Sequence, residues 1–259
     1  MKLTKRNYFS KKSNMHYMSV SQFKRFERCA ASALAELQGK YEQEKGVALL
    51  VGSFVDAYFE GPKHFEKFLA ENYTAIYTQK GTLRAEFVQA EAIIERMKKE
   101  KLFMEYISGK SQVIMTGTIE GVSVKIKIDS LHPDKIVDMK IMKDFQNVFI
   151  SERGSLPWFD AWGYDTQGAV YQEIVRQNIG ERLPFYLAGA TKEKITDLDI
   201  VHIGQSHLDI ALDHFRQYAP LYDAIKQGII EPERCETCEW CKKTKVLTEP
   251  KEADEFYLM

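Results

Sequence analysis

The sequence predicts an α/β protein in which helices flank a central mixed sheet. Three observations support this fold class. Apolar and polar side chains alternate in several runs near the middle of the chain, as they do in half-buried strands. Longer segments before and after these runs carry apolar residues at helical spacing. The chain has 259 residues, of which 44% are hydrophobic, so it is long enough to bury a sizeable core.

We expect one domain that spans residues 1–259. Within it, residues 1–110 should form an N-terminal helical segment and residues 111–204 a core that contains the sheet. Residues 205–259 should form a last helix followed by a cysteine-rich segment. No internal repeat or low-complexity tract divides the chain.

Three helices are predicted in the N-terminal segment. The first extends from Ser19 to about Gln38, because Ser19 and Gln22 have the spacing of a capping box. The second covers about residues 47–59 and is almost entirely apolar. The third covers about residues 83–101 and places five apolar side chains on one face, namely Phe87, Ala90, Ile93, Ile94 and Met97.

Three strands follow, at about residues 113–119, 122–131 and 136–142. Turn residues separate them, Glu120-Gly121 first and His132-Pro133-Asp134-Lys135 second. Alternation places Asp129 on the polar face of its strand, and Asp138 and Lys140 on one face of the next. If the second and third strands pair as an antiparallel hairpin, these three side chains converge.

The remaining elements alternate between helix and strand. A helix of about residues 159–178 ends at Gly180, and two strands follow at about 185–191 and 200–203. A last long helix covers about residues 206–227. Helices on both sides of such strands give an α/β sandwich around a mixed sheet.

Asp129, Asp138 and Lys140 are the candidate reactive residues. Two neighbouring carboxylates repel each other unless a cation lies between them, and oxygen ligands suit Mg²⁺ or Mn²⁺. A lysine beside them can orient a water molecule or stabilise charge on a phosphate. The pattern therefore indicates metal-dependent phosphodiester chemistry. The alternative is an exposed polar hairpin with an incidental Asp-Lys pair.

The same residues resemble the motifs of the PD-(D/E)XK nuclease superfamily. Asp129 followed by residues 138–140 resembles its D … (D/E)-x-K core, and Gln167 with Tyr171 resembles the Q-x-x-x-Y helix of the RecB-like branch. Residues 52–56 resemble the G-x-x-x-H helix of that branch, and residues 19–29 resemble its opening S-x-S-x … C segment. Length and motif order are most similar to RecE-like phage exonucleases, also called the exonuclease VIII type.

This resemblance implies a restriction-endonuclease-like core and assigns roles to its residues. Asp129, Asp138 and the backbone carbonyl of Met139 bind the metal, and Lys140 acts on the water or on the scissile phosphate. Gln167 and Tyr171 bind DNA phosphate or the terminal nucleotide. Without the resemblance, Tyr171 is an aromatic residue at the edge of the core.

Asp56 stands where the superfamily usually has a histidine. It lies in the apolar run of residues 47–59, which we expect to be largely buried, and a buried acid needs a partner. We expect Asp56 to bind the metal or a metal-bound water. The alternative is a carboxylate that caps a helix or bonds a tyrosine.

Four cysteines form the second chemical signal. Cys235, Cys238 and Cys241 have C-x₂-C-x₂-C spacing, and Cys29 lies near the other end of the chain. Four thiols can ligate one soft metal centre, either [4Fe–4S] or zinc. The arrangement resembles the iron–sulfur site of the AddB and Cas4 nucleases, which favours [4Fe–4S]. Reduced free thiols, with Cys29 as a small buried side chain, are the alternative.

Composition limits the partners and the location of the protein. The formal net charge is −1, so affinity for DNA must come from local patches. Candidate DNA-binding residues are Lys125, Lys127 and Lys192. The aromatic residues near 144–162 either stack on bases or pin a loop to the core. We expect a cytoplasmic protein without membrane contact, since no apolar run has the length of a span and the first residues lack a signal-peptide pattern.

The residues predict metal-dependent phosphodiester chemistry, and the resemblance implies a Mg²⁺-dependent exonuclease that acts on double-stranded DNA ends. From the resemblance we expect 5′-to-3′ digestion in phage recombination or DNA repair, a single-strand annealing protein as partner, and a ring-shaped homo-oligomer. Three alternatives remain open. They are a Cas4-like nuclease for single strands or flaps, a non-catalytic DNA- or protein-binding module held by iron–sulfur or zinc, and a metal-dependent hydrolase with another substrate.

Overall fold

A five-stranded mixed sheet forms the centre of the protein in the computed structural model, which describes residues 1–43, 46–151, 153–247 and 249–250. The strand order is β1-β2-β3-β6-β7. β3 and β6 run parallel, whereas the other neighbours are antiparallel. This confirms the predicted fold class and all five predicted strands. Their bounds are β1 (Lys110–Ile119), β2 (Val122–Leu131), β3 (Ile136–Met142), β6 (Phe185–Thr191) and β7 (Leu198–Ile203).

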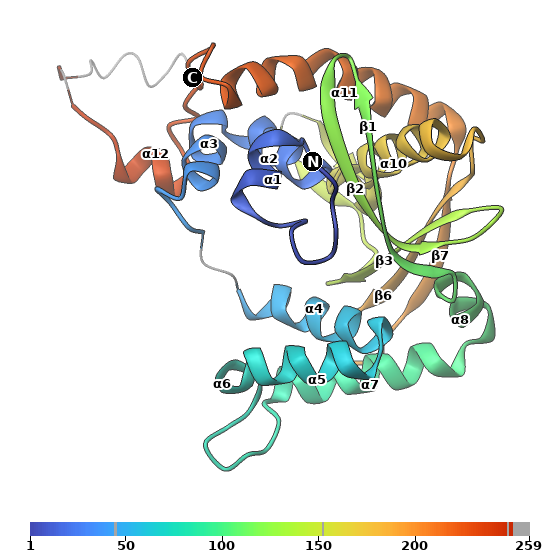
Figure 1. The fold of residues 1–259 in the computed structure, drawn as a ribbon. Coiled ribbons are helices and arrows are strands. Elements are labelled where there is room, and N and C mark those ends of the chain that lie inside the picture. Colours follow the sequence, from blue (N-terminus) through green and yellow to red (C-terminus); the bar gives the residue numbers. More distant parts are fainter. Residues whose placement is uncertain (44–45, 152, 248, 251–259) are drawn as a thin grey trace.

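Helices cover both faces of this sheet (Figure 1). On one face, α4 (Val47–Glu60) packs against β3, and α7 (Ala85–Lys99) packs against β6. On the other face, α10 (Tyr164–Ile179) packs against β1 and β2, and α11 (Gln205–Lys226) packs against α10. Each face has its own apolar core, with Phe54, Phe87 and Ile93 on the α4 side and Val124, Val170 and Phe215 on the α10 side.

Shorter elements complete the described part of the chain. Those near the N-terminus are α1 (Lys11–His16), α2 (Val20–Arg28) and α3 (Ala30–Gln38), and α12 (Glu239–Lys243) packs against α3. α5 (Pro62–Glu71) and α6 (Tyr73–Ile76) follow α4, and α8 (Lys101–Ile107) leads into β1. The hairpin of β4 (Val148–Ile150) and β5 (Gly154–Leu156) precedes α9 (Trp158–Ala161). The sequence analysis did not predict α1, α5, α6, α8, α12 or the β4–β5 hairpin, because they are too short to show a clear period. It placed α2, α3 and α9 within longer helices.

The predicted helix of residues 19–38 is two helices. The backbone of Cys29 is extended, with φ −167° and ψ 107°, so α2 ends and α3 begins there. The Cys29 thiol caps α3 by accepting a hydrogen bond from the backbone N–H of Ser32 at 3.5 Å. The capping box of Ser19 and Gln22 is present as predicted. The break was missed because the apolar spacing continues across it.

The predicted helix of residues 159–178 is also divided. Gly163 separates α9 from α10 and has φ 62°, a left-handed conformation that glycine adopts readily. Within α10, a Cβ on Gly168 would lie closer than 3.0 Å to the ring of Phe185 in β6. The glycine therefore lets α10 approach the sheet closely.

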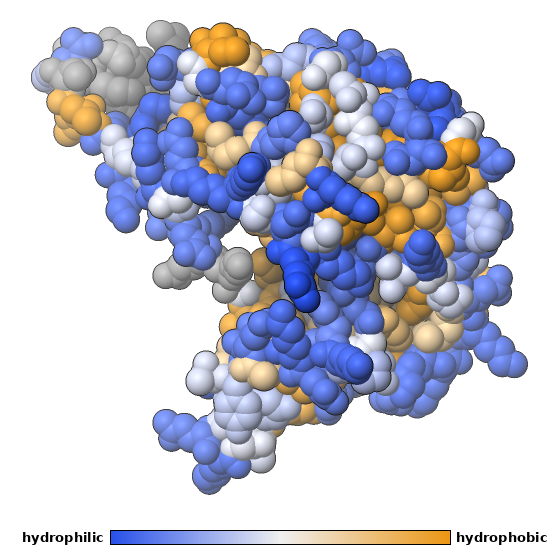
Figure 2. Space-filling view, in the orientation of Figure 1, coloured by the Kyte–Doolittle hydropathy of each residue, from blue (hydrophilic) through white to orange (hydrophobic). Residues whose placement is uncertain are grey.

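The surface on the side of the N-terminal helices is mainly hydrophilic (Figure 2). It is hollowed between these helices and α4 below them. Among the described residues, every helix is too short or too polar to span a membrane.

Candidate active site

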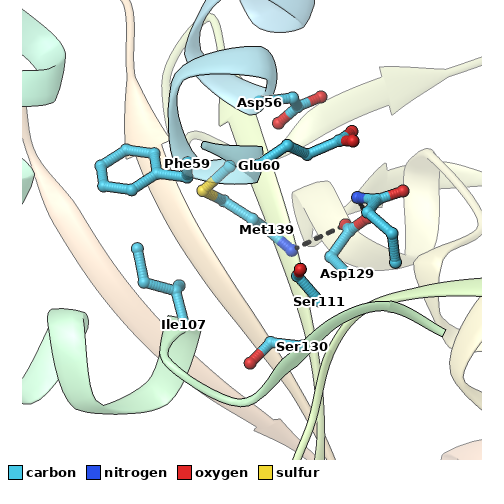
Figure 3. A pocket seen from close by; sticks show the side chains of 9 residues that line it. Asp56, Phe59, Glu60, Ile107, Ser111, Asp129, Ser130 and Met139 are labelled. Carbon is cyan, nitrogen blue, oxygen red and sulfur yellow. Dashed lines mark hydrogen bonds between the residues drawn. The ribbon is translucent and has the colours of Figure 1, made fainter. Parts of the chain in front are cut away.

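The candidate site lies where β2 and β3 separate. The two strands pair only at Ser130 with Val137 and at Leu131 with Ile136. Beyond these pairs, the Asp129 carboxylate bonds the neighbouring strand, because its Oδ2 accepts a hydrogen bond from the Met139 backbone N–H at 3.2 Å. Figure 3 shows this bond. The predicted hairpin is therefore present, and its open end holds a carboxylate.

Asp138 is buried beneath this opening and is held from two sides. Its side chain is 1% exposed and forms an ion pair with Lys140. Its Oδ1 accepts a hydrogen bond from Gln167 Nε2 at 2.6 Å. The Lys140 Nζ also lies 4.9 Å from the ring centroid of Tyr164. Two residues of α10 therefore position the Asp138-Lys140 pair.

Asp56 approaches the same site from α4. Asp56 and Glu60 are one helical turn apart, and both line the pocket that contains Asp129 and Met139 (Figure 3). The Asp56 side chain is half-buried, whereas the sequence predicted a buried acid, so the prediction is met only in part. Burial raises the pKa of Asp56 to about 7, and the charges of Asp138 and Glu60 add to this effect, whereas Lys140 opposes it.

The charges of Asp129, Asp138 and Lys140 act on one another. Burial raises the pKa of Asp129 well above its usual value, and the charge of Asp138 raises it further. Burial lowers the pKa of Lys140, but the charges of Asp138 and Asp129 outweigh burial, so the pKa is raised overall. Lys140 is therefore protonated, and a cation among the carboxylates would relieve their repulsion.

The donor set fits Mg²⁺ or Mn²⁺. Asp56, Asp129 and Asp138 supply oxygen atoms, which these hard cations prefer. Gln112 adds a further oxygen atom. It is 8% exposed, its Nε2 donates to Asp129 Oδ1 at 3.3 Å, and its Oε1 has no partner among the described residues. A buried amide oxygen without a partner at this pocket suits a cation or a water bound to one.

Three residues of the site were missed by the sequence analysis. Glu60 could have been found from its spacing, since it follows Asp56 by four residues on one helix face. Gln112 could not, because it reaches Asp129 through strand pairing and has φ 55°, which is uncommon for glutamine. The third is Lys24 of α2.

Lys24 connects the N-terminal helices with the site. Its Nζ donates to the carbonyl oxygens of Trp162 at 2.8 Å and Gly163 at 3.0 Å, at the start of α10. It also lies 4.9 Å from the ring centroid of Tyr164, which contacts Lys140 at the same distance. Burial, followed by the charge of Lys140, lowers the pKa of Lys24 to about 8.

The comparisons with known proteins agree with this geometry. Residues 19–244 match the family described as a PDDEXK-like domain of unknown function (DUF3799). The chain belongs to this PDDEXK-like family. A crystal structure of a candidate exonuclease from Eubacterium rectale is similar to it, with 44% sequence identity and a TM-score of 0.94. The similarity covers 99% of this chain and 98% of that one. None of the curated proteins matches this chain.

Membership of the PDDEXK-like family confirms the predicted PD-(D/E)XK superfamily. Gln167 and Tyr171 have partners within the protein, and their contact with DNA stays a prediction. Tyr171 is 8% exposed, and its hydroxyl donates to the Lys127 carbonyl oxygen at 3.0 Å. Gln167 donates to Asp138. Both side chains therefore tie α10 to the strands of the PDDEXK-like domain, Gln167 to β3 and Tyr171 to β2.

The predicted DNA contact by Lys125 is wrong. Lys125 is 1% exposed, and its Nζ donates to Tyr8 O at 2.5 Å, Ser13 Oγ at 2.9 Å and Asn14 Oδ1 at 2.6 Å. These bonds anchor the N-terminal residues on β2. Strand alternation placed Lys125 on a polar face but could not show that a distant segment covers this face.

Lys127 and Lys192 stay candidates for DNA contact in the PDDEXK-like domain. Lys127 is half-buried, and its Nζ lies 5.2 Å from the ring centroid of Phe9. Lys192 is also partly exposed, and its Nζ donates to the Ala48 carbonyl oxygen at 3.3 Å. Both residues are only partly buried.

The four cysteines form a second candidate metal site. Their sulfur atoms lie within 4.8 Å of one another, and the sulfurs of Cys29 and Cys241 are 3.5 Å apart. A hydrogen bond from Thr237 lowers the pKa of Cys235 to about 6, whereas burial raises the pKa of Cys241 to about 12. The thiols fit a soft metal centre. Their spacing resembles that around one tetrahedral ion, while a cluster between them would hold the sulfurs farther apart.

Proposed function

We propose that this protein is a metal-dependent nuclease that removes nucleotides from DNA ends. The observation that carries the proposal is that Asp56 and Asp129 line one pocket of a PDDEXK-like domain. The paired Asp138 and Lys140 lie close enough to shift the pKa of both carboxyl groups. The similarity to a candidate exonuclease along nearly the whole chain supports the exonucleolytic mode.

Each residue of the site has a chemical task in this proposal. Asp129, Asp138 and the Met139 carbonyl would hold Mg²⁺ or Mn²⁺, with Asp56 as a further ligand or as the acceptor of a bound water. The cation supplies polarisation of the phosphoryl oxygen and lowers the pKa of a water molecule. Lys140 orients the attacking water or stabilises charge on the phosphate. Gln167 fixes the Asp138 carboxylate.

We further propose linear double-stranded DNA as the substrate, with digestion from the 5′ end. The resemblance to RecE-like exonucleases supports this polarity. It also supports a cytoplasmic role in phage recombination or DNA repair, a single-strand annealing protein as partner, and a ring-shaped homo-oligomer. A Cas4-like nuclease would use the same residues and differ by preferring single strands or flaps.

The decisive experiment uses a linear duplex labelled at either end, with Mg²⁺ or with EDTA, beside a closed circle and a single-stranded flap. Wild type is expected to release the 5′ label as small products with Mg²⁺ and to spare the circle. Asp138→Ala should release none. Asp134→Ala, which removes an exposed acid of the β2–β3 turn, should cut like wild type. If wild type purified without oxygen cuts nothing with Mg²⁺ or Mn²⁺, the proposal fails.

We also propose that Cys29, Cys235, Cys238 and Cys241 bind one metal centre. The resemblance to AddB and Cas4 favours [4Fe–4S], whereas the close sulfur spacing favours zinc. Iron, sulfide and zinc contents of protein purified without oxygen decide between them. Protein that contains none of the three would show that the thiols are free.

A further inference from the structure

An aromatic and basic groove lies beside the candidate active site. Phe149 of β4 is 75% exposed and Trp162 is 46% exposed, although large aromatic side chains are usually buried. Both line one groove together with Tyr164, Lys143 and Lys192. We call the groove formed by these five residues the β4 groove.

Tyr164 joins the β4 groove to the catalytic residues. Its ring centroid is 4.9 Å from Lys140 Nζ, and Lys140 pairs with Asp138. Its hydroxyl donates to the sulfur of Met142, the last residue of β3, at 3.4 Å. A DNA strand with its scissile phosphate at Lys140 would therefore place neighbouring nucleotides along this groove.

The backbone that carries Trp162 is held firmly. Its carbonyl oxygen accepts a hydrogen bond from Lys24 Nζ at 2.8 Å, and its N–H donates to the Trp158 carbonyl oxygen at 3.1 Å. Trp158 is 5% exposed and packs against Phe145, with ring centroids 5.4 Å apart. One tryptophan thus anchors the segment in the core and the other is presented at the surface. Because its backbone is already ordered, Trp162 loses less entropy when a ligand stacks on it than a residue of a mobile loop would.

Basic side chains accompany these rings. Lys143 is 94% exposed and contacts Asp144 at 3.3 Å, and Lys192 lies on the same groove. Trp162 also borders a second groove, whose three lysine and arginine residues are matched by three acids, Glu27, Asp160 and Asp165. The β4 groove has two lysines and a single acid, Asp144. The β4 groove is therefore the better match to a polyanion. Exposed rings beside cations are typical of surfaces where bases stack and phosphates pair with lysine.

We propose that the β4 groove binds single-stranded DNA next to the scissile bond. Trp162 and Phe149 stack on its bases, and Lys143 and Lys192 contact its phosphates. Bases within a duplex already stack on one another, so an unpaired strand is the form of DNA that offers free faces to these rings. The inference rests on the proposed function, because it states that the duplex substrate reaches that site as a strand that has separated from its partner at the DNA end.

Binding of a fluorescein-labelled oligothymidylate in EDTA tests the inference without catalysis. Trp162→Ala and Phe149→Ala are each expected to weaken binding about tenfold, as expected for the loss of stacking on one base. Leu102→Ala is the matched control, because Leu102 is 54% exposed but lies on α8. It should bind like wild type. Trp162→Phe should keep most of the affinity and lose the quenching of tryptophan fluorescence that binding causes in wild type.

Two results would overturn the inference. One is equal affinity of wild type, Trp162→Ala and Phe149→Ala, and the other is equal loss of affinity in Trp162→Phe and Trp162→Ala. The assay also separates this inference from the proposed function. A protein that binds the oligothymidylate through Trp162 but cuts no DNA with Mg²⁺ refutes the nuclease alone. An active nuclease whose Trp162→Ala variant binds normally refutes the β4 groove alone.

Discussion

Individual buried carboxyl groups at the candidate site make the stability of the metal-free protein depend on pH. Folding raises the pKa of Asp56 to about 7 and raises that of Asp129 well above its usual value, mainly through burial. In the unfolded chain both groups titrate near about pH 4. The folded state therefore binds more protons than the unfolded state between about pH 4 and pH 7. Its stability must fall as the pH rises through this window.

We expect the free energy of unfolding, measured with denaturant in EDTA, to be lower at about pH 8 than at about pH 5. Asp56→Asn should reduce this difference, since an amide does not titrate. Asp134→Asn, at an exposed acid, should leave it unchanged. Saturating Mg²⁺ should raise the stability of wild type most at high pH, where the carboxylates are ionised. Stability that is flat or rises across the window without metal would contradict these assignments.

The Gln112 side chain supports Asp129, a candidate metal ligand, although the Gln112 backbone has an unfavourable conformation. Its φ of 55° is uncommon for a residue with a side chain, and its amide holds Asp129. Asn tolerates this conformation better than most residues but is one carbon shorter. We expect Gln112→Asn to fold normally and to need about tenfold more Mg²⁺ for DNA cleavage.

The Mg²⁺ dependence of cleavage, together with thermal unfolding, checks this expectation for Gln112. Gln79→Asn at an exposed position serves as the control for the chemical change. An unchanged Mg²⁺ requirement in Gln112→Asn would mean that Asp129 is positioned by Met139 alone.

At the scale of elements, α10 determines whether the site is assembled. It carries Gln167, Tyr164 and Tyr171, and Gly168 sets its distance from the sheet. Alanine at a helix interior is favoured over glycine by about 1 kcal/mol. A Cβ at position 168, however, would lie closer than 3.0 Å to three ring atoms of Phe185. The overlap should outweigh the gain in helix propensity.

We expect Gly168→Ala to lower the free energy of unfolding by roughly 1–3 kcal/mol, the usual cost of overpacking. Gly52→Ala in α4 is the matched control, because its Cβ would have Ile141 Cβ at 3.9 Å as nearest neighbour. That variant should be as stable as wild type or more stable. Denaturant unfolding of both proteins measures the difference, and equal stability of the two variants would show that α10 can move away from β6 at no cost.

The elements that the sequence predicted are those with a long, clear period. All five strands of the sheet, and α4, α7 and α11, were placed within a few residues. The breaks at Cys29 and Gly163 were missed, because a single residue in another backbone conformation leaves the apolar spacing unchanged. The β4–β5 hairpin was missed because three-residue strands show no alternation.

The candidate site was likewise predicted only where a local pattern encodes it. Asp129, Asp138 and Lys140 were predicted to converge because they lie on adjacent strands and a local turn brings them together. Lys24 reaches the site from a segment far away in sequence, and no local pattern encodes that approach. The burial of Lys125 beneath residues 8–14 is likewise a result of tertiary packing.

At the scale of the whole molecule, the cysteine site joins the two ends of the chain. Cys29 precedes α3, and Cys235, Cys238 and Cys241 lie in or beside α12, so four thiols connect segments that are remote in sequence. A metal bound there restricts both segments. α2 then extends from Cys29 to Lys24, which holds the start of α10. The cysteine site is thus connected through α2 to the candidate active site.

Cys235→Ser tests this connection with the least disturbance, since Cys235 is only partly buried. We expect the variant to lose its metal and its midpoint of thermal unfolding to fall by roughly 5 °C, as a loss of about 2 kcal/mol would cause in a chain of this size. Hydrogen exchange should accelerate in α2, α3 and α12 and stay unchanged in β2 and β3, because the sheet has its own core. DNA cleavage should weaken although no catalytic residue has changed. If stability and exchange equal those of wild type, the thiols carry no metal and the N-terminal helices are held by packing alone.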